Sequence, residues 1–192
     1  MEKSLLRRNF SALRRAIPPD RKAVCDHAIR EALRSLPEFR TAAGVVGFVP
    51  FGAEPDLMPF VGETRFFLPR FDETCGVYTV AEITDPDREL VSGRYGIPEP
   101  HPELPAASES EKSGLLFLIP AVACDRNGVR LGRGGGWYDR LLPSVGLPRI
   151  AVIYSCQLSG EPLPCEEHDR KMDIVVTEKE ILRFAAERKC GF

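Results

Sequence analysis

Residues 115–120 read Leu-Leu-Phe-Leu-Ile-Pro, an unbroken apolar run whose length is typical of a strand buried on both faces. Other short segments are either apolar throughout or alternate between apolar and polar residues. They lie at 44–49, 65–69, 78–83, 150–154 and 174–176. Because helical stretches separate several of these segments, the pattern predicts an α/β protein with a largely parallel sheet that is covered on both faces.

The segments outside the predicted strands divide into helices and loops. Apolar residues recur at helical spacing over 3–17 and again over 20–36, with two prolines between them, which predicts an N-terminal helical pair at about 3–36. Residues 84–113 are rich in Pro, Glu and Ser and predict a long surface loop. Thr177 followed by Glu180 has the spacing of a capping box, which predicts a closing helix.

The length and composition limit the class of protein. A chain of 192 residues with 43% hydrophobic residues predicts a single domain, 1–192, with a substantial core. The net charge of -2 argues against general nucleic-acid binding. No segment approaches the ~20 apolar residues of a membrane span, and the N-terminus lacks the apolar core of a secretory signal. We therefore expect a cytoplasmic protein with no nucleic-acid or membrane partner, whose six cysteines are reduced thiols without zinc-binding spacing.

A glycine-rich segment follows the strand at 115–120. Residues 131–140 read Leu-Gly-Arg-Gly-Gly-Gly-Trp-Tyr-Asp-Arg, with four glycines in five positions. Glycine loses more backbone entropy on folding than any other residue, so such a loop indicates positive φ angles or close approach to a ligand, commonly a phosphate. The segment lacks the Lys-Ser/Thr of a P-loop, and Trp137 stands where a dinucleotide fingerprint needs a small residue. A plain glycine-rich turn is the alternative.

Charged side chains near this loop suggest phosphate and metal contacts. Lys3 and Arg7 share one face of the first helix and could clamp a phosphate, or could simply be solvated. Asp139 could hold Mg²⁺ beside phosphates or interact with a helix dipole, and Asp173 could be a second carboxylate or a surface residue.

The remaining candidates have equally open roles. Glu54 could hydrogen-bond a polar ligand or cap a short element. Trp137 and Tyr138 could stack on a flat heterocycle or belong to the core. His168 is expected to be structural. Because no nucleophile motif of a hydrolase is present, the candidates favour phosphoryl transfer, which depends mainly on positioning and charge.

Taken together, these motifs resemble the 5-formyltetrahydrofolate cyclo-ligase family, also called methenyltetrahydrofolate synthetase. The resemblance spans nearly the whole chain, through residues 3–7, 48–54, 93–100, 119–125 with 130–140, and 168–169 with 173. Trp137 stands where the family commonly has tyrosine, and Cys124 where it commonly has phenylalanine. Both keep an apolar body.

The resemblance implies a three-layer α/β/α fold similar to the ribose-5-phosphate isomerase and CoA-transferase group. It implies ATP- and Mg²⁺-dependent closure of 5-formyltetrahydrofolate to 5,10-methenyltetrahydrofolate by a monomer. The folate would carry one or several glutamates. ATP would be held by Lys3, Arg7, Arg130, Leu131, Gly132, Arg133, Gly134, Gly135, Gly136, Trp137 and Tyr138. The folate would be held by Val49, Glu54, Arg133, Gly134, Gly135, Gly136 and Trp137. Catalysis would fall to Arg133, Glu54 and Tyr138, and magnesium to Asp139 with Asp173.

Two other classes of function stay open on the sequence. One is a regulator that binds ATP without turning over folate. The other is a kinase or ligase that acts on a different small molecule with the same fold, because similarity of fold alone does not fix function.

Overall fold

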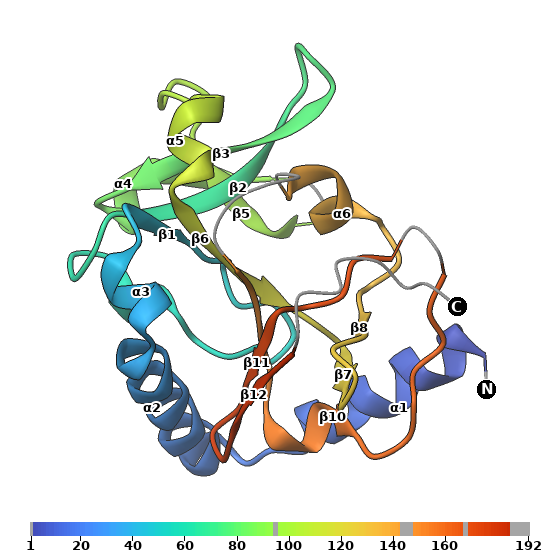
Figure 1. Cartoon of the computed structure of the whole chain (residues 1–192). Coiled ribbons are helices and arrows are strands. Elements are labelled where there is room, and N and C mark those ends of the chain that lie inside the picture. The colour runs from blue at the N-terminus through green and yellow to red at the C-terminus, as the bar shows by residue number, and fades with distance from the viewer. Residues whose placement is uncertain (1, 94–95, 143–147, 167–168, 185–192) are drawn as a thin grey trace.

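The structure is a computed structural model that describes residues 2–93, 96–142, 148–166 and 169–184, without the side chains of Trp137 and Asp139. Its central feature is a seven-stranded sheet with the order β12-β11-β9-β6-β1-β2-β3 (Figure 1). The strands of this sheet are β1 (Gly44–Val46), β2 (Phe66–Asp72), β3 (Val77–Ile83), β6 (Leu115–Pro120), β9 (Arg149–Val152), β11 (Ile174–Val176) and β12 (Ile181–Arg183).

The five inner strands of this sheet run parallel, and one antiparallel strand closes each edge. β6 lies at the centre, where Leu116 pairs with Val45 of β1 and Leu118 pairs with Ile150 of β9. The edge strands β3 and β12 pair antiparallel with β2 and β11. The predicted largely parallel α/β sheet is therefore confirmed, with β6 as its central strand.

Helices cover the sheet because its strands present apolar side chains on both faces. The helices are α1 (Lys3–Arg15), α2 (Pro19–Ser35), α3 (Pro37–Thr41), α4 (Pro86–Glu89), α5 (Glu109–Ser113) and α6 (Trp137–Leu141), with short 3-10 turns η1 (Met58–Phe60) and η3 (Ser155–Gln157). Ile29 and Leu33 of α2 pack with Leu116 and Leu118 on one face, whereas Leu141 of α6 belongs to the core of the other face. This arrangement gives the expected three layers.

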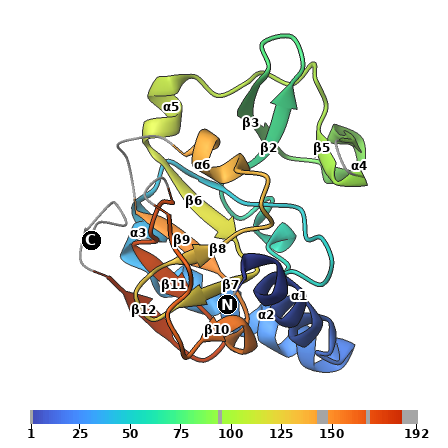
Figure 2. The ribbon, with the colours of Figure 1, turned by 90° about the vertical axis from the view of Figure 1, so that its right-hand side faces the viewer.

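Two small sheets complete the architecture. One has the order β10-β7-β8 and consists of β7 (Ala123–Asp125), β8 (Arg130–Leu131) and β10 (Leu158–Ser159). Helix α1 packs beside it, with Leu6 in a cluster that includes Ala123 and Leu131 (Figure 2). This packing brings the start of the chain next to the glycine segment.

The other small sheet lies in the segment predicted to be one long loop. Residues 84–113 contain a hairpin of β4 (Leu90–Ser92) and β5 (Pro98–Pro100), as well as α4 and α5. Ser108 and Glu111 cap α5 reciprocally, so a capping box does start a helix here. The loop prediction was too coarse because these elements are only three to five residues long.

The predicted closing helix at Thr177 was wrong within the described residues. The Thr177 hydroxyl accepts hydrogen bonds from the backbone N–H groups of Lys179 and Glu180, and the chain then turns into β12. The same Thr side chain that caps a helix can close a tight turn, and pairing with β11 selects the turn.

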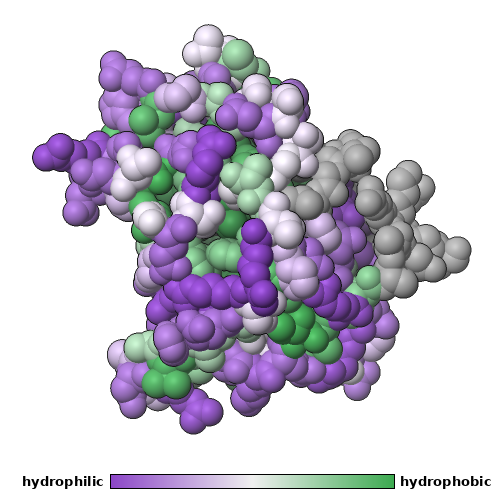
Figure 3. All heavy atoms as spheres, turned by 60° about the vertical axis from the view of Figure 1, so that its left-hand side comes forward, coloured by the Kyte–Doolittle hydropathy of each residue, from purple (hydrophilic) through white to green (hydrophobic). Residues whose placement is uncertain are grey.

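Among the described cysteines, one departs from the sequence expectation. Cys25, Cys75, Cys124 and Cys156 are free thiols, whereas Cys165 is disulfide-bonded, which corrects the expectation of reduced thiols at that position. Hydrophilic residues dominate the face shown in Figure 3, where hydrophobic residues form small separated groups. Among the described residues, no helix is both long and apolar enough to span a bilayer.

Candidate active site

A cavity of about 970 Å³ opens where the parallel strands β1 and β6 end. Ligands of open α/β sheets bind at this carboxyl edge because the loops that leave neighbouring strands meet there. The cavity is lined by most of the site residues predicted from the sequence: Lys3, Arg7, Val49, Glu54, Arg130, Leu131, Gly132, Arg133, Gly134, Gly135, Gly136 and Tyr138. The structure thus brings together residues from the first helix, the loop after β1 and the glycine segment.

The glycine segment adopts backbone angles that favour glycine at two positions. Gly134 has φ 99° and Gly136, which precedes α6, has φ 62°. Side chains with a Cβ rarely adopt such angles, so glycine is required for this shape. The Arg7 Nε donates to the Gly132 carbonyl at 2.8 Å, which ties α1 to the loop. The loop therefore depends on glycine for its shape, is bordered by cations and forms one wall of the cavity.

Lys3 lies at the same wall, between two acidic side chains. Its Nζ lies 2.7 Å from the Glu166 carboxylate and 3.0 Å from the Asp169 carboxylate. Burial alone would lower the pKa of Lys3, but the hydrogen bonds to these two carboxylates outweigh it and the pKa is raised. Lys3 therefore stays positively charged at the cavity wall, where Glu166 and Asp169 balance its charge.

Glu54 occupies a strained turn at the end of the loop after β1. Gly52 and Ala53 both have positive φ, 60° and 64°, and Ala53 is the only described non-glycine residue with such an angle. This turn buries the Glu54 side chain to 4% exposure and lets its Oε2 accept from the Phe51 N–H at 3.1 Å. A sparsely populated backbone angle that aims a buried carboxylate at a cavity is typical of a functional site.

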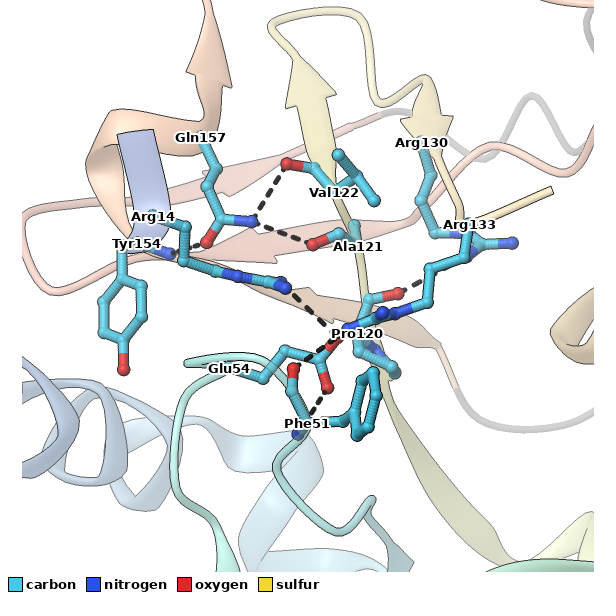
Figure 4. A network of polar contacts seen from close by, with 10 residues as sticks. All are labelled: Arg14, Phe51, Glu54, Pro120, Ala121, Val122, Arg130, Arg133, Tyr154 and Gln157. Atoms are coloured by element: carbon cyan, nitrogen blue, oxygen red, sulfur yellow. Dashed lines mark hydrogen bonds and ion pairs between the residues drawn. The ribbon is translucent and has the colours of Figure 1, made fainter. Parts of the chain in front are cut away.

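Two arginines approach the Glu54 carboxylate from different sides (Figure 4). Arg133 Nη2 lies 2.7 Å from Glu54 Oε1 and also donates to the Phe51 carbonyl at 2.9 Å, with its guanidinium over the Phe51 ring. Arg14 Nη1 lies 3.4 Å from the same oxygen. Arg14 is only 3% exposed, and its burial lowers its pKa.

Sequence reasoning missed Arg14 as a site residue. It lies in the last turn of α1, where a basic residue is ordinary because it complements the helix dipole. Its partner is 40 residues away in the chain. No local signal could have identified the contact.

A buried glutamine that sequence reasoning also missed fixes the end of β6. Gln157 is 1% exposed, and its amide nitrogen donates to the carbonyls of Ala121 and Val122, both at 2.9 Å. Its amide oxygen accepts from the Tyr154 N–H (Figure 4). These bonds hold the backbone that leads from β6 into the cavity wall. No motif surrounds Gln157 in the sequence.

Comparisons with known proteins identify the family of this chain. The model of the 5-formyltetrahydrofolate cyclo-ligase family matches residues 1–178. The chain belongs to this family. The Mycolicibacterium smegmatis 5-formyltetrahydrofolate cyclo-ligase is 34% identical to it, over 90% of this chain and 95% of that protein. The Escherichia coli K12 5-formyltetrahydrofolate cyclo-ligase is 29% identical, over 88% of this chain and 96% of that protein.

Solved structures of the cyclo-ligase family have the same fold. The Aquifex aeolicus 5,10-methenyltetrahydrofolate synthetase superimposes with a TM-score of 0.83 at 31% identity, covering 100% of this chain and 97% of that one. The Mycoplasma pneumoniae 5,10-methenyltetrahydrofolate synthetase gives a TM-score of 0.71 at 19% identity, over 93% and 99% of the two chains, and supports the fold alone. The family resemblance and the enzyme class expected from the sequence are confirmed.

Tyr138 lies in α6 beside the cyclo-ligase cavity. The guanidinium of Arg130 lies 5.7 Å from the centre of its ring. Burial, followed by the nearby charge of Glu54, raises the pKa of the Tyr138 phenol, so it stays protonated near neutral pH and keeps a hydrogen to donate. The side chain of Trp137 lies outside the described part of the structure.

Of the two carboxylates predicted to bind metal, only Asp173 has a described side chain. Asp173 does not line the cavity, and its Oδ2 accepts from the backbone N–H and the Nε of Arg149 at 2.8 and 3.2 Å. Asp139 has its backbone in α6, directly after the glycine loop, but its side chain is not described. His168 lies outside the described residues.

The donor set limits the kind of metal site that fits. The described side chains include no group of three or more His, Cys, Asp or Glu residues placed to hold a metal ion. Magnesium at a nucleotide site takes most of its ligands from phosphates and water, with only one or two carboxylates from the protein. The described side chains therefore do not form a metal site of their own.

Proposed function

We propose that this chain catalyses the ATP- and Mg²⁺-dependent closure of 5-formyltetrahydrofolate to 5,10-methenyltetrahydrofolate, with release of ADP and phosphate. One observation carries the proposal: a single cavity joins a cation-bordered glycine loop to a buried carboxylate held by arginine. The glycine loop fits a polyphosphate, and the carboxylate fits the N–H groups of a folate. ATP and a folate bearing one or several glutamates are the ligands in this proposal, which also has the chain acting as a cytoplasmic monomer.

The phosphate end of the cavity would bind ATP. Lys3, Arg7 and Arg130 supply positive charge, and the glycine loop over 132–136 supplies backbone N–H groups. Mg²⁺ bound to the phosphates would neutralise their charge, and Asp139 is the residue of this chain placed in sequence to hold it. Arg133 would stabilise the charge that develops as the γ-phosphoryl group leaves ADP.

The other end of the cavity would bind the folate against apolar residues. Phe48, Val49, Leu68 and Ile97 line this end beside Glu54. The Glu54 carboxylate would accept a hydrogen bond from a folate N–H, and Tyr138 would donate its phenolic hydrogen to an oxygen that gains charge. The two substrates would therefore be held with the formyl oxygen facing the γ-phosphate.

The reaction balances as an activation followed by an intramolecular attack. The formyl oxygen takes the γ-phosphoryl group from ATP, which releases ADP and makes the formyl carbon a strong electrophile. N10 of the same folate attacks this carbon and loses its proton, and the C–O bond breaks so that phosphate leaves with the former formyl oxygen. Because N10 and the carbon belong to one bound molecule, proximity lowers the barrier substantially.

The test is to follow the absorbance of the methenyl product after mixing the protein with 5-formyltetrahydrofolate and Mg²⁺, with and without ATP. An ATP-dependent rise with stoichiometric ADP supports the proposal. ATP binding without any rise rejects folate turnover and favours a regulator, and ADP release without the product favours another substrate.

A pair of arginine variants tests the assignment of the site. Arg133→Met is expected to lower kcat by about 10²–10³-fold, the usual cost of losing one charge-stabilising donor. Arg126→Met is the matched control, because Arg126 is an exposed arginine that pairs with Glu180 and does not line the cavity. Similar activity in both variants would reject the role of Arg133.

A further inference from the structure

The Glu54 carboxylate is shared by two arginines that differ in their freedom to move. Both guanidinium groups contact the same Glu54 oxygen, Oε1. Arg14 Nη1 lies 3.4 Å from it and Arg133 Nη2 lies 2.7 Å from it. The side chain of Arg14 is 3% exposed, whereas that of Arg133 is 45% exposed. Glu54 and Arg133 line the cavity, but Arg14 does not. One arginine can therefore reach a ligand, and the other reaches only Glu54.

We propose that Arg14 is a positioning residue that remains on Glu54 as a permanent counter-ion, so that Arg133 can leave Glu54 for the phosphates of ATP. The inference rests on the proposed function, because it assigns Arg133 two successive partners. Without Arg14, the departure of Arg133 would leave a buried carboxylate without a counter-charge, which is strongly unfavourable. With Arg14 in place, the charge of Glu54 stays balanced throughout.

The surroundings of Arg14 indicate a functional rather than a purely stabilising contact. Its Nε is the only buried side-chain nitrogen or oxygen atom in the described residues that lacks a hydrogen-bond partner. The positive φ of Ala53 adds backbone strain in the adjoining turn. Unsatisfied polar groups and strained backbone both cost stability, and native proteins keep them mainly where function requires the geometry.

The contacts of Arg133 allow it to move. Its guanidinium lies 4.7 Å from the ring centre of Phe51, which is itself 39% exposed, and its remaining bonds go to the Phe51 carbonyl and Glu54. The positive charges of Arg14 and Arg133 also repel each other across the shared oxygen. Burial is the main cause of the lowered pKa of Arg14, and the charge of Arg133 adds to it. An arriving polyphosphate would therefore compete for Arg133 against a carboxylate that already has a second partner.

The experiment measures ATP affinity by calorimetry in a double-mutant cycle. In Arg14→Gln, Arg133 is the remaining charged partner of Glu54 and stays on it. ATP is therefore expected to bind about tenfold more weakly, which is the value of one charge-assisted contact. Adding Glu54→Gln releases Arg133 and is expected to restore the affinity to within about threefold of wild type. Arg14→Lys keeps the charge and is expected to behave like wild type. Arg14→Met replaces Arg14→Gln if the latter does not fold.

Arg70 provides the matched control for loss of a buried guanidinium. It is 8% exposed and donates to the backbone carbonyls of His101 and Leu104. Arg70→Gln is expected to leave ATP affinity unchanged in both the wild-type and Glu54→Gln backgrounds. A folded Arg14→Gln with wild-type affinity, or a loss that Glu54→Gln does not rescue, overturns the role of Arg14.

The outcomes for Arg14 and for the proposed function are separable. Ring closure by the wild-type protein tests the proposed function alone. If the wild-type protein closes the ring and the rescue fails, only the inference about Arg14 is rejected. If the wild-type protein does not bind ATP, both are rejected.

Discussion

Gly134→Ala tests whether the glycine loop binds phosphate through its backbone shape. Gly134 has φ 99°, and a methyl group added there would lie 3.4 Å from the Arg7 guanidinium. A residue with a Cβ in the left-handed region costs about 1–2 kcal/mol. For a protein of this size that cost lowers Tm by about 2–8 °C. If the loop relieves the strain by moving, ATP binding loses up to the same free energy, which weakens it by about 5–30-fold.

Two further glycines separate strain from function. Gly62 has φ 88° and open space around it, and it lies outside the cavity, so Gly62→Ala is expected to lower Tm by a similar amount without changing the KM for ATP. Gly160 has no positive φ and no atom within 4 Å of an added methyl group, so Gly160→Ala is expected to change neither quantity. For all three variants and wild type, Tm is measured by thermal unfolding and the KM for ATP in one steady-state assay.

Each part of this reasoning has its own refuting result. A Gly134→Ala protein with wild-type KM and ATP affinity would show that the loop does not contact the nucleotide through its backbone. A Gly62→Ala protein with an unchanged Tm would show that the strain has been overestimated. A changed KM for ATP in Gly62→Ala would show that backbone strain outside the cavity also alters ATP binding.

The remaining predictions concern the core, the strand end and the metal. Burial raises the pKa of the Cys124 thiol from its ordinary 9.0 to about 12, so its contribution to stability is complete below pH 9 and disappears between pH 9 and 12. From pH 7 to 10 wild type is expected to lose about 1 to 2 kcal/mol of stability relative to Cys124→Ala in urea unfolding, and parallel curves would contradict this. Gln157→Ala leaves two buried carbonyls unpaired and is expected to cost about 2–4 kcal/mol in the same measurement, so a cost under about 0.5 kcal/mol would disprove their role. Asp173→Asn weakens the contact with Arg149 and is expected to lower stability without changing the Mg²⁺ concentration for half-maximal activity. Asp139→Asn is expected to raise that concentration about tenfold. A raised Mg²⁺ requirement in Asp173→Asn but not in Asp139→Asn would place the metal at Asp173.

Local patterns in the sequence were sufficient for much of the fold. Five or six apolar residues in succession are typical of a strand covered on both faces, and the run at 115–120 forms the central strand β6. The spacing of Lys3 and Arg7 placed both on one helix face, and both line the cavity. The turn at Thr177 was not predictable in this way, because a Thr hydroxyl caps helices and turns alike.

The sequence by itself determined the strands of the central sheet other than β12, the first helices, the glycine loop and membership of the cyclo-ligase family. These follow from hydrophobic periodicity, backbone preference and motif order, which are properties of neighbouring residues. Only the tertiary structure decided that Arg14 and Arg133 share Glu54 and that Gln157 holds the end of β6. These contacts join residues 35 to 79 positions apart in the chain. Their formation depends on the order and register of the strands, which bring distant loops to one edge of the sheet.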